Sequence, residues 1–217
     1  MRCYAYVAPL LLAGPLLAQG FSIDDFDSLP NDEIGGDRQV SGFVGVNPFS
    51  QPSSFDVFDT FSFAGINGAA IFNSGIGVEQ LGNMSWDNQQ AGLDLNLAAM
   101  GVVGFELDFL QIDQAFEIEI VLESFGFNPD GKARFTTTIG PVTSLTTYAF
   151  SIDDFTSDPA SGFSFAKVDS FTINFNLRAN PTASLDFILT EFRATVPTPG
   201  AAALLGLGGL IATRRRR

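Results

Sequence analysis

The sequence of 217 residues contains no histidine and a single cysteine, Cys3. Without histidine, a Ser-His-Asp triad, an imidazole base and histidine ligands for a metal ion are all excluded. Cys3 lies in an amino-terminal segment that we expect to be removed, so the mature chain would form no disulfide. The sequence also lacks a GxSxG motif and a phosphate-binding loop of the Walker type. From these absences we predict that the protein is not an enzyme.

Basic residues are also scarce. All 24 acidic residues lie between Asp24 and Glu191, and the six basic residues of segment 21–195 leave that segment a formal charge of −18. Because contacts to phosphate groups need lysine and arginine, this charge argues against binding of nucleic acid. A glycoside hydrolase needs only two carboxylates, and a chain this rich in acids will contain such a pair by composition alone. A two-carboxylate glycoside hydrolase therefore stays open as a second alternative.

An uncharged apolar run occupies the amino terminus. Residues 1–18 carry one charge, on Arg2, and then a stretch rich in leucine and alanine that ends at Ala18. This is the layout of a secretory signal peptide, and the run is short for a membrane span. The alternative is a buried amino-terminal helix, which Pro9 and Pro15 would interrupt. We therefore expect the protein to be exported.

The carboxyl terminus, residues 196–217, combines three features in a fixed order. They are a proline-containing break, an uncharged apolar run expected to be a short helix, and a basic end: Val196, Pro197, Pro199 and Gly200, then 201–213, then Arg214, Arg215, Arg216 and Arg217. This ending resembles the PEP-CTERM sorting signal of exported bacterial proteins, with Thr198 in place of the usual glutamate. The resemblance implies processing by an exosortase-like membrane protease, transient membrane contact through residues 201–213, and a final location in the cell envelope, at the cell surface or outside the cell. A simple membrane anchor and a basic nucleic-acid tail are the alternatives.

Between the two ends, residues 21–195 show the alternation of apolar and polar residues that is typical of β-strands. The clearest examples are the segments 105–109, 116–122 and 171–177. Glycine, proline and asparagine separate such segments at short intervals, and no segment has the period of an amphipathic helix. The 23 phenylalanines can fill a core between two sheets. We predict an all-β fold, a single jelly-roll-like β-sandwich over residues 21–195.

The hexapeptide FSIDDF occurs twice, at residues 21–26 and 150–155. The flanking sequences differ, so we interpret the copies as two separate strands, each with phenylalanine and isoleucine inward and aspartate outward, rather than as a duplicated unit. Together with segments 168–171 and 185–192, they resemble galactose-binding-like jelly rolls, a group that includes carbohydrate-binding modules.

The same resemblance implies a structural calcium ion between the opening and closing strands. The matching positions are Asp24, Asp25 and Asp186. Carboxylates are suitable ligands for calcium, but the spacing is not that of an EF-hand loop. The alternative is that these acids, like the second acidic cluster within residues 27–37, are solvated and bind nothing.

A sugar-binding site is predicted around Trp86, the single tryptophan. Its indole could stack on a sugar ring, and Asp87, Asn88 and Gln89 follow it with hydrogen-bonding groups. The alternative is that Trp86 belongs to the core and the polar run is a turn. The sequence thus predicts a non-catalytic protein of the cell surface or extracellular matrix, with a carbohydrate-binding module for exopolysaccharide as the first alternative.

Overall fold

The computed structural model describes residues 19–26, 38–58, 68–88, 90–126, 131–157 and 162–197. The signal segment 1–18 and the sorting motif from Thr198 onward lie outside the described residues. Within the described ranges, no helix is long and apolar enough to cross a membrane. The strands there are β1 (Gln19–Asp24), β2 (Arg38–Val46), β3 (Ser53–Phe58), β4 (Ala69–Ser74), β5 (Glu79–Trp86), β6 (Gly104–Ile112), β7 (Phe116–Ser124), β8 (Gly131–Ile139), β9 (Thr146–Ser151), β10 (Thr156–Ser157), β11 (Ser170–Phe175) and β12 (Asp186–Val196), and a 3-10 helix, η1, spans Ile152–Asp154.

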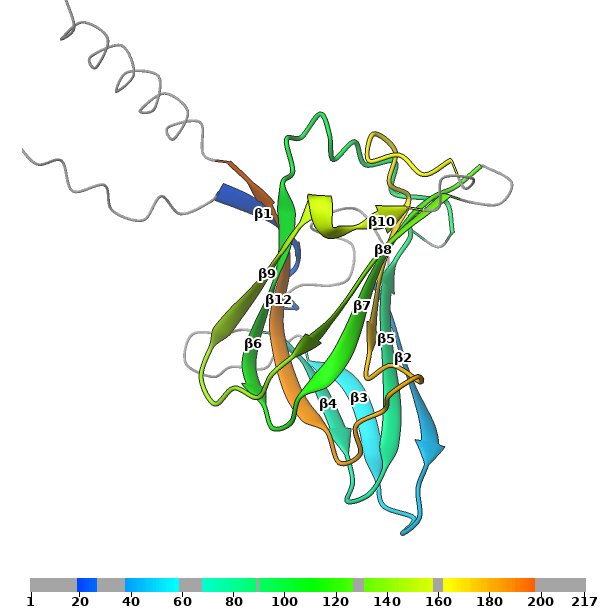
Figure 1. The fold of residues 1–217 in the computed structure, drawn as a ribbon, viewed down its shortest axis with the longest axis vertical. Helices are drawn as coiled ribbons and strands as arrows, with labels where there is room; N and C mark the ends of the chain where they lie inside the picture. The colour runs from blue at the N-terminus through cyan, green and yellow to red at the C-terminus, as the bar shows by residue number, and fades with distance from the viewer. Residues whose placement is uncertain are drawn as a thin grey trace, which may run out of the picture.

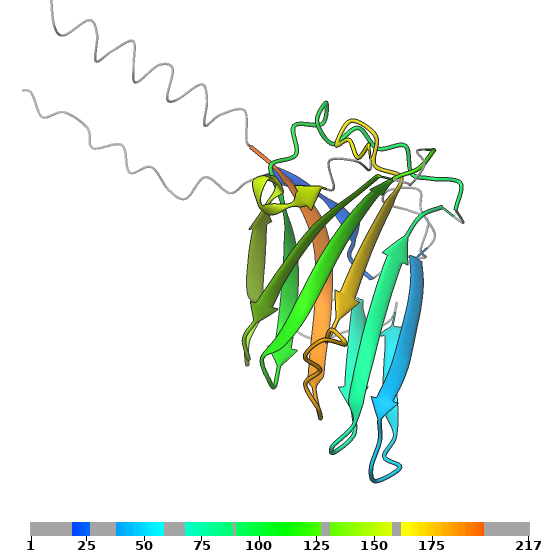
Figure 2. The same cartoon turned by 45° about the vertical axis from the view of Figure 1, so that its right-hand side comes forward.

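These strands form two antiparallel sheets that pack face to face (Figures 1 and 2). Sheet A has the order β3-β4-β12-β6-β9, with β1 added beside β12, and sheet B has the order β10-β8-β7-β11-β5-β2. In sheet B, β5, β7 and β11 largely alternate between buried and partly exposed residues, as the sequence pattern predicted for β7 and β11. The predicted all-β sandwich is confirmed.

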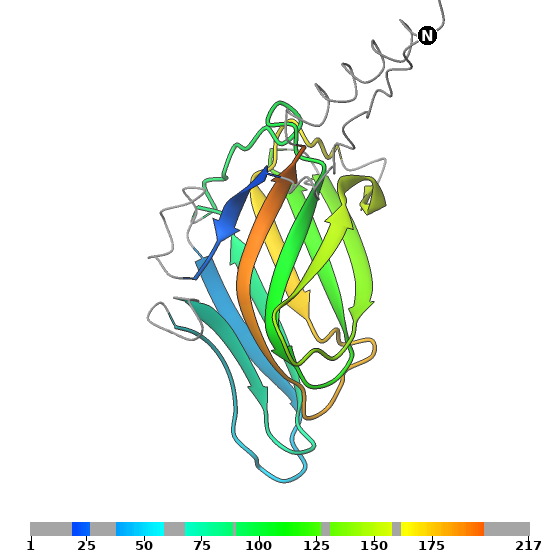
Figure 3. The same ribbon diagram turned by 90° about the vertical axis from the view of Figure 1, so that its left-hand side faces the viewer.

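The closing strand β12 holds sheet A together. One of its edges pairs with β6, and the other pairs first with β4 and then with β1. Gln19 of β1 lies opposite Val196 of β12, so the first and last described strands end side by side (Figure 3). The start of β1 and the end of β12 therefore lie at one corner of the sandwich.

Phenylalanine rings fill the space between the sheets. Phe187 of β12 lies at the centre, stacked on Phe72 and Phe116 with ring centroids 4.8 and 5.2 Å away. It also contacts Phe175, whose strand belongs to the opposite sheet. Because aromatic side chains bury a large apolar area, this cluster stabilises the domain without disulfides.

The two copies of FSIDDF have different structures. The first forms β1, where Ile23 and also Asp24 are buried. In the second copy the strand stops at Ser151, which caps η1, and Asp153 and Asp154 are exposed. The interpretation of both copies as strands with outward aspartates is therefore wrong for η1 and for Asp24.

Candidate functional site

Trp86 does not form the predicted sugar platform. Its side chain is 1% exposed and packs on Phe192, with ring centroids 5.4 Å apart. The indole Nε1 donates a hydrogen bond of 2.9 Å to Asp24 Oδ2. A buried ring cannot stack on a ligand from solvent, so the core alternative for Trp86 is correct and the predicted stacking role is wrong.

Asp24 lies in a buried network that joins the two sheets. Its carboxylate accepts hydrogen bonds of 2.7 and 2.8 Å from Arg38 Nη1, and one of 2.9 Å from the Phe26 amide. The Arg38 guanidinium also lies over the Phe26 ring, 5.3 Å from its centroid. Together with the indole of Trp86, these groups give both oxygens of the Asp24 carboxylate hydrogen-bond donors from the protein. Arg38 supplies the positive charge that balances Asp24.

The three predicted calcium ligands are not brought together. Asp24 lies opposite Phe192, which is six residues along β12 from Asp186, or about 20 Å in an extended strand. Asp25 directly follows Asp24 at the β1 end of this span. In the part of the chain that the structure describes, no three acidic, histidine or cysteine side chains are placed to hold a metal ion. Asp24, Asp25 and Asp186 therefore do not form the predicted calcium site.

Asp186 has a local structural role instead. Its carboxylate accepts a 2.9 Å hydrogen bond from the Ser74 amide, and its own amide donates to Asp113 Oδ1. The pKa of Asp186 is raised above its usual value, mainly by burial. The hydrogen bond from Ser74 lowers the pKa, and the negative charge of Asp113 raises it further. Asp186 thus ties β12 to β4 and to the end of β6.

The polar residues after Trp86 form a turn, and two of their side chains hydrogen-bond to other protein groups. Asp87 accepts a hydrogen bond of 3.2 Å from the side chain of Gln39, and the Asn88 side chain donates to the carbonyl of Gly92. Gln89 lies outside the described residues. Because Trp86 is buried, none of the predicted sugar-binding residues offers an aromatic ring to a ligand.

Sheet A carries one charged cluster on its outer face. Arg193 bridges Glu106, Asp108 and Glu191, and Asp108 also accepts from the Thr147 hydroxyl. Burial lowers the pKa of Arg193, but the hydrogen bond and charge of Asp108, the charge of Glu191 and the hydrogen bond to Glu106 together raise it above its usual value. All three carboxylates therefore have the same arginine as a partner, an arrangement that suits a structural ion-pair network.

The outer face of sheet B is different, because polar side chains line up across its strands. The register places one row of five residues side by side on neighbouring strands, about 19 Å from end to end. These are Thr136 on β8, Glu119 on β7, Asn174 on β11, Asn83 on β5 and Ser41 on β2. The row gives this face closely spaced hydrogen-bonding groups.

Side-chain hydrogen bonds connect Asn83, Asn174 and Glu119 in the middle of this row, and Glu119 is also bound by Arg134 of β8. We call these four residues the polar ladder. Asn83 Nδ2 donates to Asn174 Oδ1, and Asn174 Nδ2 donates to Glu119 Oε2, both at 2.8 Å. Arg134 Nη1 then donates to Glu119 Oε1 at 2.9 Å. Because each side chain holds the next, a polar ligand would find its partners already oriented.

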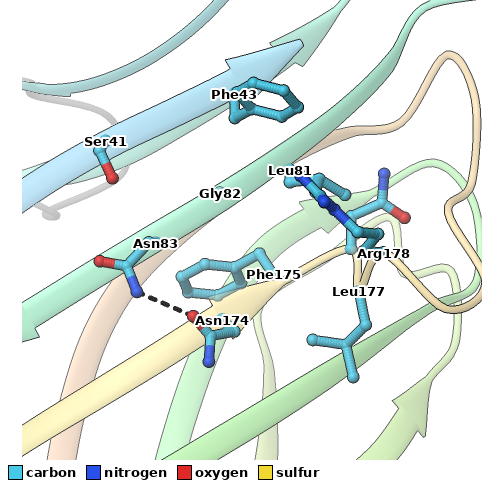
Figure 4. A pocket seen from close by; sticks show the side chains of 10 residues that line it. Ser41, Phe43, Leu81, Gly82, Asn83, Asn174, Phe175, Leu177 and Arg178 are labelled. Atoms are coloured by element: carbon cyan, nitrogen blue, oxygen red, sulfur yellow. Dashed lines mark hydrogen bonds between the residues drawn. The ribbon is translucent and has the colours of Figure 1, made fainter. Parts of the chain in front are cut away.

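Two shallow hollows share part of their lining, and the first of them includes two ladder residues. The first, about 240 Å³, is lined by Ser41, Asn83 and Asn174 together with Phe43, Leu81 and Arg178 (Figure 4). The second, about 290 Å³, continues past Phe43, Leu81 and Arg178 toward Glu79. Phe43 is 56% exposed, and the Arg178 guanidinium lies over its ring, 5.4 Å from the centroid. The Phe43–Arg178 pair thus lies at the boundary between the hollows.

Asn176 positions the turn that carries Arg178. It is fully buried, and its backbone has a φ of +58°. Its side chain donates to the carbonyls of Gln80 and Thr182 at 2.7 and 2.8 Å and accepts from the Thr182 amide at 2.6 Å. These bonds fasten the turn after β11 to β5, so the position of Arg178 follows from Asn176.

Sequence reasoning missed every member of the polar ladder and the Phe43–Arg178 pair. The available signal was the outward-facing asparagines of two strands, Asn83 in LGNMSW and Asn174 in TINFN. Their strands are 91 positions apart in the sequence, and only the sheet register brings them together.

No family model and no curated protein sequence matches this chain. Among solved structures, a family 11 carbohydrate-binding module from Clostridium thermocellum, in complex with a β-1,3-1,4-mixed-linked tetrasaccharide, superposes with a TM-score of 0.50 over 82% of this chain and 96% of that one. The fold is a jelly roll. Identity to that module is 11%.

Two further similar structures come from the same organism. A family 11 module of a cellulosomal cellulase has a TM-score of 0.49 with 12% identity, covering 83% of this chain and 96% of that one. A family 30 carbohydrate-binding module has a TM-score of 0.47 with 14% identity, covering 72% and 92%.

Proposed function

We propose that the chain is a non-catalytic carbohydrate-binding protein that holds a polysaccharide on the outer face of sheet B. The observation that carries the proposal is the polar ladder beside a hollow that contains an exposed aromatic ring. Amides, a carboxylate and a guanidinium supply both donors and acceptors for sugar hydroxyls, and Phe43 supplies an apolar surface. The similar module that holds a tetrasaccharide has the same jelly-roll fold, and this similarity supports the proposal only at the level of the fold.

Affinity electrophoresis of the full chain tests this proposal. Gels that contain soluble neutral and acidic polysaccharides should retard the protein in at least one case. The Asn174→Ala variant should bind about tenfold more weakly, because it removes the central member of the ladder and releases Asn83 and Glu119. Asn73→Ala is the matched control, since Asn73 is exposed on β4 of sheet A. Equal loss in both variants, or no loss in Asn174→Ala, contradicts the proposed face.

The sequence features at the two ends support a location for this activity. Within the same proposal, the protein is exported through residues 1–18 and sorted to the cell surface through the PEP-CTERM-like end, where it binds exopolysaccharide of the envelope. A truncation that tests the sorting step should begin at Thr198, because Val196 still pairs with Gln19 in the sandwich. Loss of surface localisation without residues 198–217 is expected. Unchanged localisation and an unchanged mature mass would contradict sorting by this segment.

A further inference from the structure

Arg178 differs from the other basic residues of the described chain in its partners. Each of the other five forms an ion pair: Arg38 with Asp24, Lys132 with Glu123, Arg134 with Glu119, Lys167 with Asp169 and Arg193 with three carboxylates. For Arg178, no carboxylate among the described residues lies within ion-pair distance. Its guanidinium lies over the ring of Phe43 instead. Residues 21–195 carry a formal charge of −18, so a cation with no carboxylate among its described neighbours stands out.

The position of Arg178 gives it access to a ligand. It is an exposed residue of the turn after β11, and it lines both hollows, the first of which also includes Asn83 and Asn174 of the polar ladder. A guanidinium that stacks on an aromatic ring through its face keeps its N–H groups in the plane, directed away from the ring. Those donors match the two oxygens of a carboxylate in a bidentate arrangement.

We propose that the ligand of this face carries carboxylates, as a polysaccharide of uronic acids does, and that Arg178 binds the carboxylate of one sugar while the polar ladder binds hydroxyls. This inference rests on the proposed function and adds the chemical class of the polysaccharide. The negative charge of the domain does not prevent such binding, since charges beyond about 8 Å are largely screened at physiological ionic strength. Glu79 lines the second hollow, so the carboxylate is placed on the first hollow, where Arg178 lies beside uncharged residues.

Calorimetric titration of the full chain with a tetragalacturonate and with a neutral mixed-linked tetrasaccharide measures the preference. The parent protein should bind the acidic oligosaccharide more tightly. Arg178→Ala should reduce the ratio of acidic to neutral affinity by at least about tenfold, the loss expected for a charge-assisted hydrogen bond. Lys132→Ala is the matched control, because it also removes one positive charge from sheet B. Lys132 lies on β8 beside Glu123, at the end of β7 that is far from the turn of Arg178. Its ratio should stay within about twofold of the parent.

The outcomes separate this inference from the proposed function. If Arg178→Ala leaves the ratio unchanged while both oligosaccharides still bind, the carboxylate preference is wrong and the polysaccharide face stands. If sodium acetate at the same carboxylate concentration competes as well as tetragalacturonate, Arg178 is a simple anion site and the inference is overturned. If neither oligosaccharide nor any polysaccharide binds the folded protein, both proposals fail.

Discussion

Replacing Arg38 by methionine is expected to lower the free energy of unfolding by about 3–5 kcal/mol. The substitution keeps an apolar stem but removes the charge that faces Asp24. Asp24 would then be a buried carboxylate that keeps the hydrogen bonds from the Trp86 indole and the Phe26 amide but has lost the opposite charge of Arg38. An unpaired buried charge is costly because the interior cannot replace its hydration. Urea unfolding of the full chain measures the loss.

Two further variants show whether the charge is the cause. Arg134→Met removes an arginine from a more exposed ion pair with Glu119, and a loss of about 1 kcal/mol or less is expected there. Combining Asp24→Asn with Arg38→Met should restore part of the lost stability, because neither charge is then left unpaired. A loss in Arg38→Met no larger than that in Arg134→Met would show that the buried pair does not hold β1 against sheet B.

Asn176→Ala should cost about 3–5 kcal/mol of stability and should also weaken ligand binding. It removes three side-chain hydrogen bonds and leaves the carbonyls of Gln80 and Thr182 and the Thr182 amide without these partners. Alanine also tolerates the φ of +58° poorly. Since the same bonds hold the turn of Arg178, affinity for the acidic oligosaccharide should fall even at temperatures where the variant is folded.

Asn176→Gly and Asn180→Ala complete this test. Glycine adopts positive φ freely, so the glycine variant should be about 1 kcal/mol more stable than the alanine variant and should still lack the side-chain bonds. Asn180 lies in the same turn and is exposed, and Asn180→Ala should change stability by less than about 0.5 kcal/mol. Equal stability of Asn176→Ala and Asn180→Ala would refute the structural role given to Asn176.

The sequence predicted the sandwich because its signals are local. In the segment 116–122, Phe116, Ile118 and Ile120 alternate with glutamates, and β7 has this pattern of burial. The same kind of alternation predicted β6 and β11. A strand with one buried face needs only this period of two, so neighbouring residues carry the information.

The repeated hexapeptide shows where local signals end. Asp24 is buried because Arg38 and Trp86 reach it from sheet B, whereas its counterpart in the second copy, Asp153, is exposed in η1, which Ser151 caps. Identical residues therefore have opposite environments, set by partners elsewhere in the chain. The resemblance-based calcium site failed for the same reason, since the arginine that pairs with Asp24 is 14 positions away on another sheet.

The proposed binding face could not be predicted from the sequence because it depends on strand register. Asn83, Glu119, Arg134 and Asn174 come from four strands, and a shift of one residue in any strand would turn its side chain into the core. The sugar-binding site was predicted at Trp86 because tryptophan commonly stacks on sugar rings. In the structure Trp86 is buried, and Phe43 is the aromatic residue exposed in the hollow beside the ladder.

The most direct test of the polysaccharide face is a map of backbone amide chemical shifts in the isotope-labelled full chain during titration with tetragalacturonate. We predict saturable shifts at Asn83, Asn174 and Arg178, with those of Asn73 on sheet A unchanged. Shifts confined to sheet A, or to the turn after Trp86, would contradict the assignment of the ligand to sheet B.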